Sequence, residues 1–120
     1  MRILFLGDIV GNSGCEAVKE NLESQIKLKN IDFVIVNGEN AAEQGVGITE
    51  KISKELFESG VNVITTGNHV WDQKEAIEYI ERENRLLRPE NLVYPSPGKG
   101  FQIYDTNKGF KVAVLNLMGN

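Results

Sequence analysis

Three stretches of the sequence decide the fold: residues 3–8 (ILFLGD), residues 33–40 (FVIVNGEN) and residues 61–69 (VNVITTGNH). Each begins as a short apolar run, which predicts a buried strand, and ends in side chains that carry metal-binding oxygen or nitrogen atoms. A segment with helical spacing of apolar residues follows each strand. The pattern therefore predicts an α/β fold with a mainly parallel sheet.

The ends of the three strands supply the candidate functional residues, which are Asp8, Glu39, Asn40, Asn68 and His69. Successive strands of a parallel sheet present their carboxyl ends at one edge, and ligands bind there in α/β proteins. We therefore expect the five side chains to converge, although the first and the last lie far apart in the sequence. Carboxylates, amide oxygens and an imidazole suit a hard or borderline divalent metal and hydrolysis by metal-activated water.

Two helices are expected between the strands. Ser13 and Glu16 have the spacing of a capping box, which predicts a helix that runs to about Lys29. Thr49 is placed to cap a second helix that ends near Ser59. The apolar residues expected on the inner faces of these helices are Cys15, Val18, Leu22, Ile26, Ile52, Leu56 and Phe57.

A third helix is expected after the third strand. Asp72 and Glu75 repeat the capping-box spacing. Ala76, Ile77 and Ile80 supply an apolar stripe that we expect to be buried. The predicted order of elements up to this point is βαβαβα.

An antiparallel hairpin is expected next, with strands over residues 101–105 and 110–117 joined by a turn at residues 107–109. Gly109 is expected in the left-handed conformation. The second strand holds an apolar run made of Val112, Ala113, Val114, Leu115, Leu117 and Met118. Such a run predicts burial on both faces, and hence self-association or pairing with a missing C-terminal half.

The composition is that of a soluble globular protein, and 120 residues predict a single domain over residues 1–120. No signal sequence is recognisable, and no apolar run is long enough to cross a bilayer. The single cysteine excludes a disulfide framework within the chain. These features predict a cytoplasmic protein with no membrane partner. The net charge of −4 argues against a long nucleic acid as partner, because phosphate neutralisation needs a basic surface.

Several of these residues also have simpler interpretations. Asp8 taken alone fits a turn equally well, because Asp and Gly are common in turns. A lone histidine such as His69 is more often structural, and only the shared strand edge favours a functional role. Cys15 is expected to pack within its helix, because no second cysteine or histidine can activate it. Trp71 either stacks on a substrate base or packs against the core.

Four motifs carry a family resemblance: residues 7–11 (GDIVG), 37–42 (NGENAA), 67–72 (GNHVWD) and 97–100 (PGKG). They resemble the calcineurin-like metallophosphoesterase superfamily, and in particular its YmdB-like branch of small bacterial phosphodiesterases. The resemblance covers the whole chain with matching spacing. Val10 supports the narrower branch, since many members of the superfamily have a metal-binding histidine at that position.

The resemblance implies an α/β/β/α sandwich, of which this chain would form the N-terminal half. It also implies a two-metal site, most often assigned iron with manganese or zinc as alternatives, that hydrolyses phosphodiesters such as 2′,3′-cyclic mononucleotides. By position, Asp8 and Asn40 would bind the first metal, and Glu39 would bridge the two metals. Asn68 would bind the second metal, and His69 would donate a proton to the leaving group.

The remaining metal ligands of the family are histidines in a second half that this sequence does not contain. We therefore expect a truncated domain that binds metal weakly or not at all by itself, with its own activity in question. The alternative is a non-catalytic nucleotide-binding or assembly module, as a split or decayed phosphodiesterase would be. Hydrolysis of a chromogenic phosphodiester separates the two hypotheses.

Overall fold

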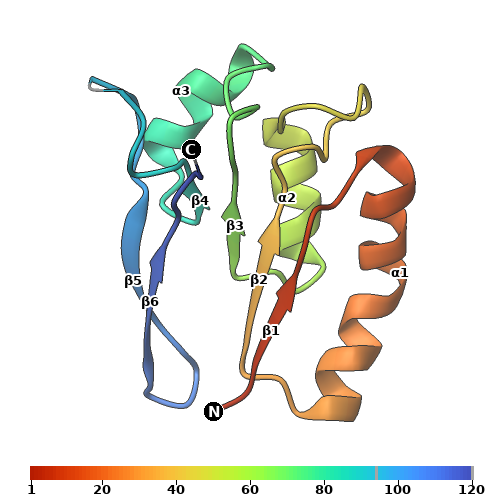
Figure 1. The fold of residues 1–120 in the computed structure, drawn as a ribbon. Coiled ribbons are helices and arrows are strands. Elements are labelled where there is room, and N and C mark those ends of the chain that lie inside the picture. The colour runs from red at the N-terminus through yellow and green to blue at the C-terminus, as the bar shows by residue number, and fades with distance from the viewer. Residues whose placement is uncertain (94, 120) are drawn as a thin grey trace.

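A parallel sheet forms the centre of the computed structural model, which describes residues 1–93 and 95–119 (Figure 1). Its strands are ordered β1 (Ile3–Leu6), β2 (Phe33–Asn37), β3 (Val63–Thr65) and β4 (Leu86–Leu87). All neighbouring pairs are parallel, so their carboxyl ends lie at one edge. Strand β4 was not predicted from the sequence, because two residues are too short for a recognisable pattern.

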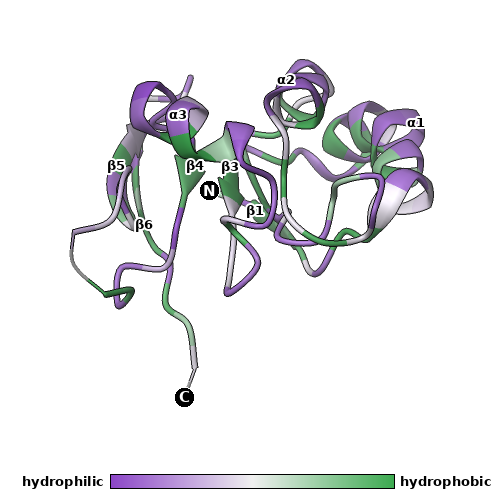
Figure 2. Cartoon of the chain, turned by 90° about the horizontal axis from the view of Figure 1, so that it is seen from above, coloured by the Kyte–Doolittle hydropathy of each residue, from purple (hydrophilic) through white to green (hydrophobic). Residues whose placement is uncertain are grey.

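Helices cover one face of this sheet, as Figure 2 shows along the strand direction. They are α1 (Gly11–Lys29), α2 (Glu50–Glu58) and α3 (Glu75–Arg82). The predicted cap of α2 is confirmed, because Thr49 Oγ1 accepts a hydrogen bond from the Ile52 N–H at 3.2 Å. Within the described residues, no helix has the length and apolar character needed to cross a membrane.

The predicted cap of α1 is wrong. The helix begins at Gly11, its N-cap residue is Val10, and no side chain caps it. Its start is fixed instead by the backbone, since the Gly11 N–H donates to the Asn40 carbonyl oxygen at 2.9 Å. Ser13 therefore lies inside the first turn of α1. Glu16 forms an ion pair with the Lys19 ammonium group.

The start of α3 also differs from the prediction. Lys74 is its N-cap residue, and the Asp72 carboxylate bonds to a histidine of the preceding loop rather than to the helix. Ala76 and Ile80 are buried as predicted, and Tyr79 completes their face at the i, i+3, i+4 spacing. This face leaves Ile77 exposed to solvent at 41%, which contradicts the expected burial.

A hairpin of β5 (Phe101–Asp105) and β6 (Lys111–Leu115) packs on the other face of the parallel sheet. Its turn follows the prediction, with Gly109 at φ +80°. The side chains of the sheet alternate between the layers. In β2, Val34 and Val36 face the helices, whereas the residues on either side of Val34, Phe33 and Ile35, face the hairpin. The fold is thus the α/β arrangement that the sequence predicts, with the start of a second β layer.

The hairpin leaves apolar surface exposed. Val112 and Val114 are buried against the parallel sheet, but Leu115 on the outer face is 54% exposed. The expected burial of β6 on both faces is therefore not met within this chain. The hairpin also does not cover β1, where Phe5 is 59% exposed. Association of the chain through these surfaces, with a second copy or with a missing half, stays a proposal.

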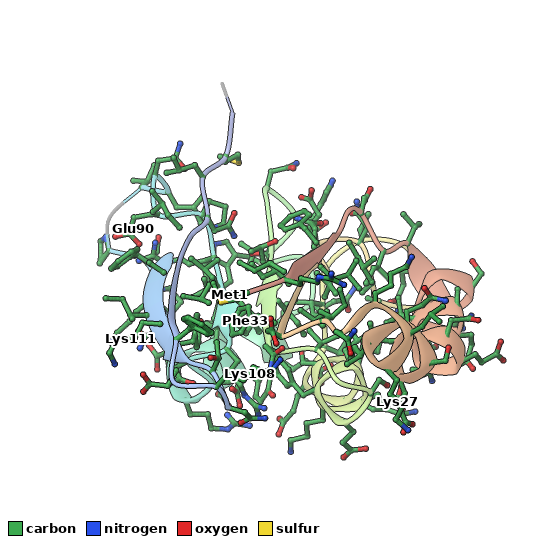
Figure 3. The ribbon with its side chains drawn as sticks, turned by 90° about the horizontal axis from the view of Figure 1, so that it is seen from below. Met1, Lys27, Phe33, Glu90, Lys108 and Lys111 are labelled. Carbon is green, nitrogen blue, oxygen red and sulfur yellow. The ribbon has the colours of Figure 1, made fainter. Side chains whose placement is uncertain are left out.

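An ion pair ties the hairpin turn to the base of the sheet. The Asp32 carboxylate accepts a hydrogen bond from the Arg2 backbone N–H at 2.7 Å and contacts Lys108 Nζ at 2.6 Å. Figure 3 shows Lys108, in the hairpin turn, next to Phe33 at the start of β2. The Lys108 ammonium and the Arg2 N–H lower the pKa of Asp32. The pair therefore stabilises the fold only while Asp32 is ionised.

Candidate active site

Asp8 and Asn40 meet at the carboxyl edge of the parallel sheet. Asp8 lies two residues after β1, and Asn40 lies in the loop after β2. The Asn40 Nδ2 atom donates to both oxygens of the Asp8 carboxylate, at 3.0 and 3.1 Å. A backbone bridge between Val10 and Asn40 holds the two loops in register. The structure therefore brings these two predicted residues together.

Glu39 is held by its own loop. Its backbone N–H donates to the Asn37 side-chain oxygen at 3.3 Å, and its carbonyl oxygen accepts from the Gly47 N–H at 2.6 Å. The loop is tied to β3, because the Gly38 N–H donates to the Thr65 carbonyl oxygen at 2.9 Å. The position of Glu39 is thus set by contacts within its own loop and, through Gly38, by a contact with β3.

The Glu39 carboxylate lies against Gly67 in the loop after β3. A Cβ atom on Gly67 would overlap a carboxylate oxygen and would lie 2.6 Å from Glu39 Cδ, so the carboxylate can occupy this position only beside glycine. Glu39 and Asn68 also line one open hollow of ≈ 480 Å³, with β6 and the residues after it on the far side. The loops after β2 and β3 therefore contribute to the same concave surface.

His69 is oriented within its own loop. Its Nδ1 atom lies 2.7 Å from Asp72 Oδ2, and its side chain is 38% exposed. If Nδ1 carries the proton that Asp72 accepts, Nε2 is the ring nitrogen that remains for a ligand. Within the described residues, no hydrogen bond joins the imidazole to Asp8, Glu39 or Asn40.

The donor atoms present fit part of a metal site. Two buried oxygens, Glu39 Oε2 and Asn40 Oδ1, have no hydrogen-bond partner among the described residues. Buried polar atoms are normally paired, so two unpaired oxygens in the loop that bonds to Asp8 through Asn40 Nδ2 are suited to a cation. Within residues 1–93 and 95–119, however, no three His, Cys, Asp or Glu side chains come together. The described residues therefore offer ligands to a metal without surrounding it.

Cys15 and Trp71 both pack with core residues, which is the structural interpretation given for each of them from the sequence. The Cys15 thiol donates to the Ala41 carbonyl oxygen at 3.4 Å, and burial raises the pKa of this thiol. A buried thiol with a raised pKa stays protonated and unreactive. Trp71 is partly buried and packs against the core on the helix side of the sheet. Neither residue is needed for the candidate site.

Four residues around the site were not predicted from the sequence: Asn37, Gly67 in its packing role, Asp72 as a histidine partner, and Asn116. Asn37 had a signal, because an Asn-Gly pair after a strand favours a turn in which the Asn side chain bonds to the backbone. Asn116 had one too, since it interrupts the apolar run of the last strand. The role of Gly67 depends on a contact between loops, and the role of Asp72 on a contact within the loop after β3.

The fold and the strand-end residues define the class: this is a calcineurin-like metallophosphoesterase fold, represented here by its parallel sheet and the first hairpin of its second layer. The sequence profile of the family described as YmdB-like protein matches residues 4–120. The chain belongs to this family.

Relatives support the assignment. The chain is 46% identical over 119 residues to a Bacillus subtilis (strain 168) protein named 2′,3′-cyclic-nucleotide 2′-phosphodiesterase, with 99% of this chain and 44% of that protein covered. The crystal structure of a hypothetical protein from Thermus thermophilus matches with a TM-score of 0.90 and 36% identity, covering 100% of this chain and 46% of the other. The crystal structure of a novel phosphatase from Mycoplasma pneumoniae matches with a TM-score of 0.88 and 36% identity, covering 98% and 43%. The chain thus spans less than half the length of these relatives.

Proposed function

We propose that this chain supplies part of the active site of a metal-dependent phosphoesterase that hydrolyses phosphodiesters such as 2′,3′-cyclic mononucleotides. The observation that carries the proposal is the pair of unpaired buried oxygens, Glu39 Oε2 and Asn40 Oδ1, in the loop that bonds to the Asp8 carboxylate. The name of the Bacillus subtilis relative supports the substrate class.

In this proposal the strand-end residues would hold two divalent metals, of which iron is the first candidate. Asp8 and Asn40 would hold one metal, Asn68 would hold the other, and the Glu39 carboxylate would serve both. When bound, such a pair supplies Lewis acidity toward water and the phosphate group. Asn40 and Asn68 add oxygen ligands without adding negative charge, which keeps the site attractive to an anionic substrate.

His69 is the proposed proton donor to the leaving oxygen. Its Nδ1 atom is engaged by Asp72 at 2.7 Å, which fixes the ring and leaves Nε2 for the substrate. Histidine suits this role because it exchanges protons near neutral pH. Asp72 then acts through His69, as a carboxylate that orients the ring.

The proposed site is shared with a second half of the fold. Residues 1–120 would form one half of a metallophosphoesterase domain, and histidines of the other half would complete the metal ligands. The coverage of 44% of the Bacillus subtilis relative supports this division. The exposed outer face of β6 is a surface that such a half would cover.

A chimera tests the proposal. Residues 1–119 replace the matching part of the Bacillus subtilis relative, and hydrolysis of bis(p-nitrophenyl) phosphate is measured with Mn²⁺ or Fe²⁺. We expect hydrolysis by the chimera and its loss in the same chimera with Glu39→Gln. Binding of a 2′,3′-cyclic nucleotide without hydrolysis would instead support the non-catalytic module. Equal rates with and without Glu39→Gln would contradict the proposed site.

A further inference from the structure

Asn116 joins the hairpin to the site edge of the parallel sheet. It follows β6 directly and is buried, with 7% of its surface exposed. Its Nδ2 atom donates two hydrogen bonds, to the carbonyl oxygens of Thr66 and Leu87, each at 3.1 Å. One side chain therefore connects the carboxyl ends of β3, β4 and β6.

The backbone of Asn116 is also held. Its N–H donates to the Gly100 carbonyl oxygen, and its carbonyl oxygen accepts from the Glu90 N–H, both at 2.8 Å. These two hydrogen bonds fix the backbone from which the Asn116 side chain extends. Thr66 is held a second time, because its hydroxyl group donates to the Leu87 carbonyl oxygen at 2.8 Å.

The loop that Asn116 holds contains the residues of the candidate site. Thr66 is followed by Gly67, against which the Glu39 carboxylate packs, and then by Asn68. Asn68 is exposed, so its position is set by the backbone of the loop rather than by side-chain packing. A shift of the Thr66 carbonyl group would therefore move both Gly67 and Asn68.

We propose that Asn116 is a positioning residue, which fixes the loop of residues 66–68 so that Asn68 and Glu39 present their oxygens to one metal site. Its significance for metal binding rests on the proposed function. Bonding the Thr66 and Leu87 carbonyl oxygens from one side chain requires a group with two N–H donors. Asparagine has two such donors, whereas an ionised Asp or a Leu has none.

The test compares Asn116→Ala with Tyr104→Phe in the 120-residue chain. Tyr104 is a matched control, because its hydroxyl group donates to the Asn84 carbonyl oxygen at 2.6 Å and so also ties the hairpin to the parallel sheet, before β4 rather than after it. Two quantities are measured by NMR: hydrogen exchange of the Val70 amide, which bonds to the Gly67 carbonyl oxygen at 3.1 Å, and the dissociation constant of Mn²⁺ from paramagnetic broadening at residues 67–68.

We expect Asn116→Ala to speed exchange at Val70 and to weaken Mn²⁺ binding by about 10–100-fold, as loss of an outer-shell partner does. Tyr104→Phe should change neither quantity. Asn116→Ser keeps one donor and should give intermediate values; it decides the matter if Asn116→Ala does not fold.

Unchanged exchange at Val70 in the Asn116 variants would overturn the positioning role. Faster exchange with unchanged Mn²⁺ affinity, or equal losses in Tyr104→Phe, would overturn its significance for the site. Absence of Mn²⁺ broadening at residues 67–68 in the wild-type chain would count against the metal site, and with it against this role in metal binding. In that case exchange at Val70 still decides whether Asn116 fixes the loop.

Discussion

Gly67→Ala should damage the metal site while leaving the fold largely intact. The added Cβ atom would lie 2.6 Å from Glu39 Cδ. Ordinary carbon–carbon contacts begin at about 3.5 Å, so the carboxyl group must retreat by roughly 1 Å. It can do so because it is the end of a flexible side chain, and the rotation costs about 1 kcal/mol of the free energy of unfolding. A ligand displaced by that distance should weaken Mn²⁺ binding about 10–100-fold.

Gly7→Ala is the matched control for this prediction. Gly7 also follows a strand and also precedes a candidate metal ligand, but a Cβ atom there meets nothing within 4 Å. Both variants are compared with the wild-type chain by urea unfolding and by Mn²⁺ titration. The expectation is refuted if Gly67→Ala binds Mn²⁺ as tightly as Gly7→Ala, or if it is destabilised by several times the expected ~1 kcal/mol.

Three further predictions concern other parts of the molecule. In the chimera with the complete site, Glu39→Gln should remove metal and activity together. His69→Ala should keep the metal and lower kcat by about 10²–10⁴-fold. Release of metal by His69→Ala, with the rate per bound metal unchanged, would exclude the proton-donor role. The wild-type chain should sediment as a dimer or larger species at micromolar concentration. Leu115→Lys should sediment as a monomer, because the substitution places a charge on the exposed outer face of β6. A compact wild-type monomer that unfolds cooperatively would contradict this prediction. Because the folded pKa of Asp32 lies below its ordinary value, its stabilisation is complete above the unfolded pKa of about 4 and is lost as the pH falls through the lower folded value. The difference in free energy of unfolding between wild type and Asp32→Asn should therefore shrink over that acid range, and a pH-independent difference would be evidence against it.

The elements that the sequence predicted well are those with a local cause. Thr49 caps α2 because its hydroxyl group can reach a helix N–H three residues ahead, which needs no other part of the fold. The strand at residues 33–37 was recognisable because it is buried on both faces and is therefore apolar throughout. The turn at Gly109 was predictable for a similar reason, since only its own backbone conformation matters.

The errors arose where a competing contact decides the local structure. Ser13 has the right spacing for a cap, but the Asn40 carbonyl oxygen starts α1 three residues earlier. Asp72 has the same spacing, but His69 competes for its carboxylate. Residue spacing alone does not show which of the competing contacts forms.

The candidate site could likewise be predicted from the sequence only in part. That Asp8, Asn40 and Glu39 would lie at one edge followed from strand topology, and the Asp8–Asn40 hydrogen bonds agree with it. The contact of Glu39 with Gly67 and the bonds from Asn116 depend on how the loops and the hairpin pack, so they required the structure.

Titration of the isolated chain with Mn²⁺ tests the central claim most directly, because the claim is that the loops after β1, β2 and β3 offer ligands to one two-metal site. We predict weak binding that broadens the amide signals of Asp8, Glu39, Asn40 and Asn68 together, and that disappears in Glu39→Gln. Broadening centred elsewhere, or undiminished in Glu39→Gln, would contradict it. Tightly held stoichiometric metal in the purified chain would contradict the conclusion that these residues form only part of the site.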